Sequence, residues 1–185
     1  REYNVWRERV EIARRQNHIG DVLLLTEEVR NPLIREEAIG QAAKALSGTG
    51  HHDLAHQQYR RGLEINPKSL IFRREEAFEL GRLKRRDEAV VKLERLVQEN
   101  GGDSETMAFL GKLYKDMWHE AWHSLEPESA RLQAAFEASF ILKRSVDTYL
   151  AAYCLDQRHF YSGINALTLL MVLDHLHRQF GQAAD

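Results

Sequence analysis

Residues 55–67 read AHQQYRRGLEINP, and this stretch decides the fold. Ala55, Tyr59 and Gly62 recur at the spacing of one helix face, so they are expected to lie on a single buried stripe. Asn66 and Pro67 then follow, and a proline directly after an apolar periodic run is a typical place for a helix to stop. The stretch therefore predicts a helix that packs through small residues and ends at a defined point.

A step of 34 residues repeats this pattern along the chain. The step joins small residues to small ones and large apolar ones to each other, with few exceptions. The positions that it joins are Ala55 to Ala89, Tyr59 to Leu93, Gly62 to Leu96, Ala43 to Ala77 and Gly111, and Leu46 to Leu80 and Tyr114. A period of 34 residues is typical of tetratricopeptide repeats, which stack pairs of antiparallel helices. We therefore predict an all-α, tetratricopeptide-like α-solenoid of about four to five antiparallel helix pairs with a C-terminal capping helix.

The predicted solenoid is a single domain over residues 1–185. Residues 1–31 are expected to form a degenerate N-terminal helix pair, in which Asp21 caps the second helix. Residues 33–102 are expected to form two regular repeats, and residues 103–185 a C-terminal part. In this last part the second-helix pattern comes late, which indicates an insertion of about 22 residues.

The composition argues against nucleic acid and membrane partners. The formal net charge is −2, and the basic residues near Arg85 are offset by acidic neighbours, whereas nucleic-acid-binding proteins usually carry a net basic surface. No run of residues approaches the roughly 18 apolar residues of a membrane span. The only cysteine, Cys154, cannot form an internal disulfide, and its apolar neighbours predict an inert core thiol. These features favour a cytoplasmic protein.

One face of each first helix lines the concave surface of such a solenoid. Counting from the expected helix starts places several charged, aromatic and hydroxyl side chains on this face, with Asn165 beside them: Arg74, Phe78, Lys112, Lys115, Tyr161 and Thr168. Cations can hold a phosphate or a carboxylate, while aromatic rings, amides and hydroxyls orient the rest of a ligand. The alternative is a groove that is simply solvated.

Residues 119–123 read HEAWH and match the H-E-x-x-H pattern. In zinc peptidases that use this pattern, the two histidines bind the metal and the glutamate activates water. Here His119, Glu120 and His123 lack an evident third ligand in the sequence, and no sheet is predicted to hold a substrate. A zinc hydrolase is therefore a remote alternative, and we predict no metal and no catalytic residues.

Two motifs resemble a known family. Residues 111–116 read GKLYKD, and after Ala152-Tyr153-x2-Asp156 comes Tyr161-x-Gly163-Ile-Asn165-x2-Thr168-Leu-Leu. Together they resemble the TRAFs-binding, or tetratricopeptide-repeat sensor, region of apoptosis-signal-regulating kinases and their bacterial relatives. The family's motif positions fall here on these residues: Gly111, Lys112, Tyr114, Lys115, Asp116, Tyr161, Gly163, Asn165 and Thr168. Lys112 stands where many relatives have arginine, so the charge is kept but a bidentate fork is lost.

The resemblance implies a sensor or scaffold in a conflict or stress system. In bacterial relatives the region is proposed to recognise a nucleotide-derived signal and to control a linked effector. We therefore expect a non-catalytic domain without a cofactor that binds a small anionic, nucleotide-derived ligand, with an effector domain elsewhere in its parent protein. Gly111, Tyr114 and Gly163 are interpreted as packing residues, and Asp116 as a partner that holds a lysine. The alternative is a scaffold that binds a peptide or partner domain in the same groove.

Overall fold

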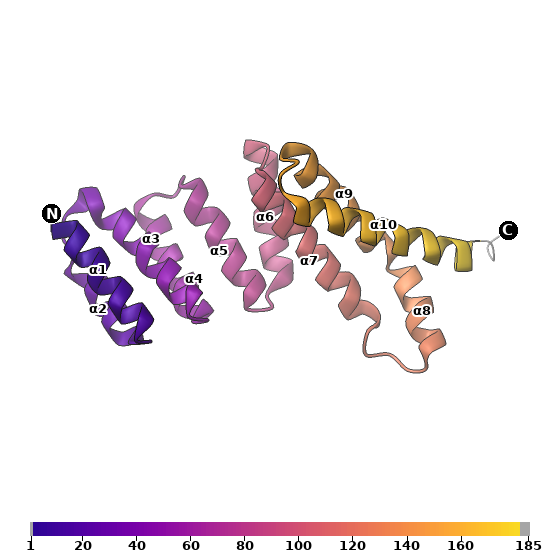
Figure 1. Cartoon of the computed structure of the whole chain (residues 1–185), viewed down its shortest axis with the longest axis horizontal. Coiled ribbons are helices and arrows are strands. Elements are labelled where there is room, and N and C mark those ends of the chain that lie inside the picture. The colour runs from indigo at the N-terminus through magenta and orange to yellow at the C-terminus, as the bar shows by residue number, and fades with distance from the viewer. Residues whose placement is uncertain (1, 182–185) are drawn as a thin grey trace. The chain divides into compact units, whose positions relative to one another are not determined.

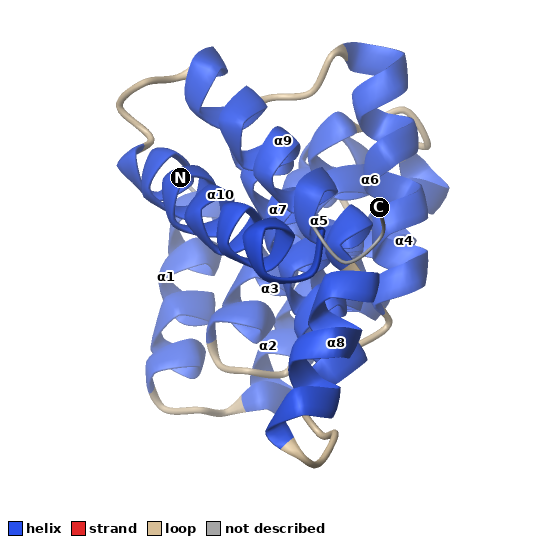
Figure 2. Cartoon of the chain, turned by 90° about the vertical axis from the view of Figure 1, so that its right-hand side faces the viewer, coloured by secondary structure: helices blue, strands red, loops and turns tan. Residues whose placement is uncertain are grey.

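The structure is a computed structural model, and it describes residues 2–181. Within these residues the chain forms ten helices and no strand, so the predicted all-α fold is confirmed (Figures 1 and 2). The helices in order are α1 (Glu2–Arg15), α2 (Ile19–Glu28), α3 (Pro32–Gly48), α4 (His52–Ile65), α5 (Leu70–Arg82), α6 (Arg86–Asn100), α7 (Ser104–Trp122), α8 (Glu128–Glu137), α9 (Ser139–Leu155) and α10 (Phe160–Phe180).

Side-chain hydrogen bonds cap the N-termini of α5 and α7, each of which is the first helix of its repeat. The Ser69 hydroxyl accepts from the Phe72 amide at 3.4 Å before α5, and the Asp103 carboxylate accepts from the Thr106 amide at 2.8 Å before α7. The expected cap at Asp21 is wrong, because α2 already begins at Ile19. Asp21 lies in the first turn instead, where its charge still favours the helix N-terminus.

The residues joined by the 34-residue step are buried. Ala43, Ala55, Ala77, Ala89 and Leu93 are all 0% exposed. The other members of the series are buried as well: Leu46, Tyr59, Gly62, Leu80, Leu96, Gly111 and Tyr114. The period in the sequence is thus the period of the core, because each repeat places its small residues where two helices approach closely.

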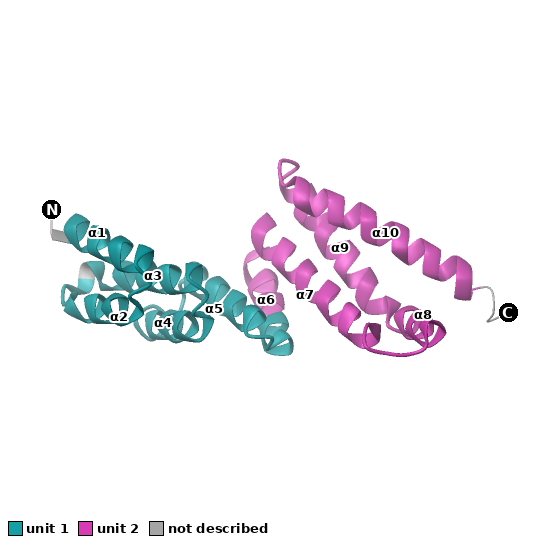
Figure 3. Cartoon of the chain, turned by 60° about the horizontal axis from the view of Figure 1, so that its bottom comes forward, with its two compact units in different colours: residues 1–92 teal, residues 93–185 magenta. Residues whose placement is uncertain are grey.

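The described chain divides into two compact units, residues 1–92 and residues 93–185 (Figure 3). The helix pairs α1/α2 and α3/α4 and helix α5 belong to the first unit, and helices α7 to α10 belong to the second. The boundary falls within α6, in the second of the two predicted regular repeats.

In unit 1, Phe72 of α5 packs against helices α3 and α4. Its ring lies against the helix backbone at Gly62, where an added Cβ would be 2.4 Å from Phe72 Cε2, and a Cβ added at Gly40 would be 3.0 Å from Cε1. At the other end, Trp6 Nε1 donates to the Leu25 carbonyl at 2.6 Å and ties α1 to α2. Glycines of α3 and α4 therefore make room for the first large ring of the next repeat.

A buried carboxylate also organises unit 1. Glu79 of α5 is 0% exposed, and it accepts from the Ser47 hydroxyl at 2.7 Å. His52 Nδ1 lies 2.8 Å from its second oxygen, and Arg82, one turn along α5, donates to the first oxygen. Buried charges are stable only when paired in this way.

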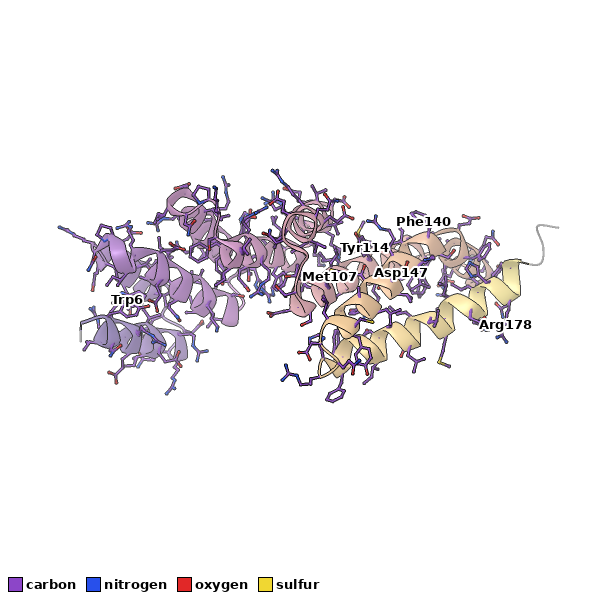
Figure 4. The ribbon with its side chains drawn as sticks, turned by 90° about the horizontal axis from the view of Figure 1, so that it is seen from above. Trp6, Met107, Tyr114, Phe140, Asp147 and Arg178 are labelled. Carbon is purple, nitrogen blue, oxygen red and sulfur yellow. The ribbon has the colours of Figure 1, made fainter. Side chains whose placement is uncertain are left out.

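Unit 2 is built on the contact between α7 and α9. The ring of Tyr149, which is 0% exposed, lies against Gly111, where an added Cβ would be 3.0 Å from the ring. Ser145 Oγ donates to the Gly111 carbonyl at 2.7 Å. Tyr114, labelled in Figure 4, is buried one turn further along α7. The absence of a side chain at Gly111 thus lets α9 approach the backbone of α7.

The inserted segment between α7 and α9 contains α8 and the loop before it. Trp118 Nε1 donates to the Ala135 carbonyl at 3.0 Å and ties α8 to α7.

The cysteine of unit 2 does not lie where the sequence predicted it. Cys154 is exposed, so the prediction of a core thiol is wrong. The buried stripe of α9 runs through Ser145, Tyr149 and Ala152, and Cys154 lies off it.

Candidate functional site

Lys115 of α7 and Asn165 of α10 meet, although 50 residues separate them in the sequence. Lys115 Nζ donates to Asn165 Oδ1 at 2.9 Å, and Asn165 Nδ2 donates to the Tyr161 carbonyl at 2.8 Å. This arrangement fixes the orientation of the Asn165 amide between Lys115 and the backbone of Tyr161. We call Lys112, Lys115, Asp116, Tyr161 and Asn165 the polar cluster.

The buried ring of Tyr149 packs against two members of the polar cluster, Lys115 and Tyr161. Lys115 Nζ lies 5.7 Å from the centroid of the buried Tyr149 ring, within the range of a cation–π contact. The rings of Tyr149 and Tyr161 meet edge to face at 5.9 Å, and their hydroxyls are 3.4 Å apart. Tyr161 is 50% exposed, so it keeps a free surface on which a planar ligand could stack.

The charges of the polar cluster are partly neutralised. Lys112 Nζ lies 2.7 Å from Asp116 Oδ2, one helical turn away, and the lysine side chain is 46% exposed. Asp116 thus holds Lys112 on the surface of α7. Two lysines and one aspartate leave one net positive charge, which would attract a small anion.

Three of the predicted ligand residues do not join the polar cluster. Thr168 is exposed, and its hydroxyl donates to the Ile164 carbonyl of its own helix at 2.8 Å. Arg74 and Phe78 belong to unit 1, where the guanidinium bonds Glu75 and lies 5.7 Å from the Phe78 ring centroid. The expectation that Phe78 lines a groove is wrong, because the ring is 3% exposed in the core and offers a ligand no surface.

A second polar group surrounds Tyr114 and was not predicted. Tyr114 donates its hydroxyl proton to Glu94, Arg144 Nη2 donates to the Tyr114 hydroxyl at 2.7 Å, and Arg144 also bonds Glu94. The guanidinium lies 4.4 Å from the Tyr114 ring centroid. Neither Glu94 nor Arg144 belongs to a motif, so spacing alone contained no signal for them.

The H-E-x-x-H residues lie at the end of α7. The rings of His119 and His123 stack at 4.7 Å with 17° between their planes, and His123 Nδ1 is 3.1 Å from the His119 carbonyl. Within residues 2–181, no group of three histidine, cysteine or carboxylate side chains is arranged to hold a metal ion. The ring of His119 contacts both His123 and Trp122.

The two buried tyrosines of unit 2 should make its stability sensitive to alkaline pH. Burial raises the pKa of both phenols, with further contributions from Tyr161 beside Tyr149 and from Glu94 beside Tyr114. In the unfolded chain they ionise near pH 10. Below that pH both states keep the proton; above it only the unfolded state releases it, so stability should fall. The expected result is a melting temperature that drops above about pH 10, and drops less in a Tyr114→Phe/Tyr149→Phe variant. Parallel curves for the two proteins would contradict this.

The family model for Tetratricopeptide Repeats-Sensor proteins matches residues 51–170, which is more than half of the chain and includes both motifs. The chain belongs to this family. The predicted resemblance is therefore confirmed. No curated protein matches the chain.

Solved structures share the fold of this sensor-family chain. A MamA structure from Desulfovibrio magneticus RS-1, described as residue 41 to the end, has 16% identity and a TM-score of 0.58, covering 96% of each chain. A MamA RS-1 ArsTM double mutant has 16% identity and a TM-score of 0.59, covering 98% of this chain and 97% of its own. Another MamA protein has 11% identity and a TM-score of 0.53, covering 96% and 94%. At these identities the likeness concerns the fold alone.

None of the helices in the described part of the chain combines the length and apolar character needed to cross a membrane.

Proposed function

We propose that this chain is a non-catalytic regulatory sensor domain whose polar cluster binds a small anionic, nucleotide-derived ligand and thereby controls a linked effector. The observation that supports the proposal is the meeting of Lys115, Asn165 and the half-exposed Tyr161 on two helices. The family membership supports the sensor role in general.

The three side chains offer complementary chemistry. Lys115 supplies a cation with donors to spare for a phosphate oxygen, since an ammonium group has three and one is used by Asn165. Tyr161 offers a ring face for a base, and its hydroxyl is a further hydrogen-bonding group. An anionic ligand that binds Lys115 would replace the neutral oxygen of Asn165 as the acceptor of its hydrogen bond. Hydrogen bonds to a charged acceptor are the stronger kind.

Calorimetric titration with a panel of ADP-ribose-like and cyclic-nucleotide ligands tests the proposal. We expect at least one ligand to bind, and Lys115→Ala to weaken that binding roughly tenfold or more, equivalent to about 1.4 kcal/mol. Lys143→Ala is the control for the loss of one lysine charge, because Lys143 of α9 pairs with Asp147 and lies outside the polar cluster. This control should bind as the wild type does.

The opposite change should strengthen binding in the same titration. Asp116→Asn removes the carboxylate that neutralises Lys112 and raises the net charge of the polar cluster.

Absence of binding across the panel, or equal affinity for wild type and Lys115→Ala, would contradict the proposed ligand site.

The second candidate is a protein-interaction scaffold that takes a peptide or partner domain on the same face. It is favoured by the half-exposed ring of Tyr161, because tyrosine is enriched where proteins contact one another. Selection of peptides against the immobilised chain would support it if Lys115→Glu abolished capture of the selected peptides. Capture that is indifferent to this charge reversal would place the peptide elsewhere.

A further inference from the structure

A continuous apolar surface lies between α9 and α10, away from the polar cluster's hydrogen bonds. It surrounds a hollow of about 470 Å³ and is almost entirely apolar. We call it the α9/α10 apolar face, and its members are Val146, Leu150, Tyr153, Phe160, Ile164, Leu167 and Leu170. Its five large exposed residues, Leu150, Phe160, Ile164, Leu167 and Leu170, are between 50% and 70% exposed. A contiguous exposed apolar surface of this kind usually marks a place where another protein surface packs.

The repeat register shows what kind of element such a surface fits. Counted from their first residues, Ser104 and Phe160, position Gly111 of α7 corresponds to Leu167 of α10, and Tyr114 corresponds to Leu170. In α7 both positions are covered by α9: Tyr149 packs on Gly111, and Arg144 packs on Tyr114. In α10 the corresponding leucines are 63% and 51% exposed. The α9/α10 apolar face is therefore the place of a second helix.

A second helix runs antiparallel to the first helix of its repeat and turns an apolar side toward it. An element that covers the α9/α10 apolar face must share these properties. Helix α10 itself has them, because its outer side is apolar over several turns. Two copies of α10 that cross at a two-fold axis perpendicular to the helix are necessarily antiparallel, so each can lie in the second-helix position of the other.

The polar groups around α10 are compatible with this pairing. Near its start, Arg158 pairs with Asp156 at 3.1 Å, and near its end Arg178 pairs with Asp174 at 2.8 Å. Each end is thus locally neutral, and opposite ends can meet without repulsion. Thr168, between Leu167 and Leu170, already donates its hydroxyl proton to its own helix, which lowers the cost of burying it.

We propose that this chain forms a symmetric dimer in which the α9/α10 apolar faces of two copies pack together, each α10 taking the place of a second helix for the other copy. The inference rests on the repeat register and on exposed apolar side chains, and it does not depend on the proposed ligand. A closed two-fold interface buries the apolar side chains of both copies and leaves no further copy of the face to recruit.

Sedimentation equilibrium of the whole chain over a range of concentrations tests the dimer. The wild type should rise from the monomer mass to twice that mass and stop there. Leu167→Asp should stay at the monomer mass, with a dissociation constant raised roughly a hundredfold or more, because the new carboxylate would be buried at the interface. Since Leu167 is 63% exposed in one copy, the variant should melt like the dissociated wild-type monomer.

Leu24→Asp is the matched control. Leu24 of α2 is 65% exposed and lies in unit 1, outside the α9/α10 apolar face, so this variant should dimerise like the wild type. The proposal would be overturned by a wild type that stays monomeric at every concentration, by a dimer that survives Leu167→Asp, or by a dimer that Leu24→Asp also abolishes. Growth beyond the dimer would overturn it as well, since a two-fold interface closes on itself.

Discussion

Tyr149→Ala is expected to lower the free energy of unfolding of unit 2 by about 4 kcal/mol, the usual cost of truncating a large buried aromatic side chain. Tyr149 is 0% exposed and packs against the backbone of α7 at Gly111, so its removal leaves a cavity between the two main helices of the unit. Urea unfolding followed by tryptophan fluorescence in a Trp6→Phe background measures the effect. In that background the remaining tryptophans, Trp118 and Trp122, both report on unit 2.

Tyr149→Phe separates the ring from its hydroxyl. It keeps the contact with Gly111 and removes only the group that lies 3.4 Å from the Tyr161 hydroxyl, so a loss of about 1 kcal/mol or less is expected. If Tyr149→Phe cost as much as Tyr149→Ala, the hydroxyl rather than the packed ring would account for the stabilisation by Tyr149.

Glu79→Ala is expected to destabilise unit 1 by about 3 kcal/mol, the lower part of the range for breaking a buried charge pair. The substitution removes the carboxylate that Ser47, His52 and Arg82 share. It also leaves a cavity beside α5, where the Glu79 side chain was buried. Arg82 is 37% exposed and can turn toward water, which limits the loss. Amide hydrogen exchange of α3, α4 and α5 would report the change where it occurs.

Glu79→Gln is the control for the shape of the side chain. The amide oxygen can still accept from the Ser47 hydroxyl, whereas the negative charge is lost. It should therefore cost less than Glu79→Ala. Equal exchange rates in wild type and Glu79→Ala would show that the buried carboxylate contributes nothing to stability.

The helices could be predicted because their packing repeats. Ala43, Ala77 and Gly111 occupy one position of successive first helices, and a position that must be small in each repeat leaves a period in the sequence. A turn signal predicted one helix end, because α4 ends at Ile65, directly before Asn66 and Pro67. The packing positions and the turn residues therefore predicted the same arrangement of helices.

Side-chain exposure was harder to predict. Phe78 was placed on a groove by counting positions, but α5 is buried over five consecutive residues from Glu76 to Leu80, more than a single helix face. Cys154 was placed in the core because its neighbours are apolar. Adjacent residues of a helix point in different directions, and here the exposed Leu155 is apolar too.

The polar cluster could be predicted only in part. Lys112, Lys115 and Asn165 were named from position and motif, but the hydrogen bond from Lys115 to Asn165 depends on how the inserted segment returns the chain to α7. Periodicity contains no information about that path, because the insertion interrupts the period. Whether a ligand binds at the polar cluster stays a prediction.

The insertion also affects the order in which the chain folds. Helices α3 and α4 are joined by residues 49–51, whereas α7 and α9 are joined by residues 123–138, which include α8. The entropy lost on closing a flexible connection grows with its length, and contacts between distant residues form more slowly. The α3/α4 pair is therefore expected to assemble first. In unit 2 the longer connection makes the contact between Tyr149 and Gly111 slower to form, and docking of α8 through Trp118 shortens that connection, so α7, α9 and α10 are expected to come together later than α3 and α4.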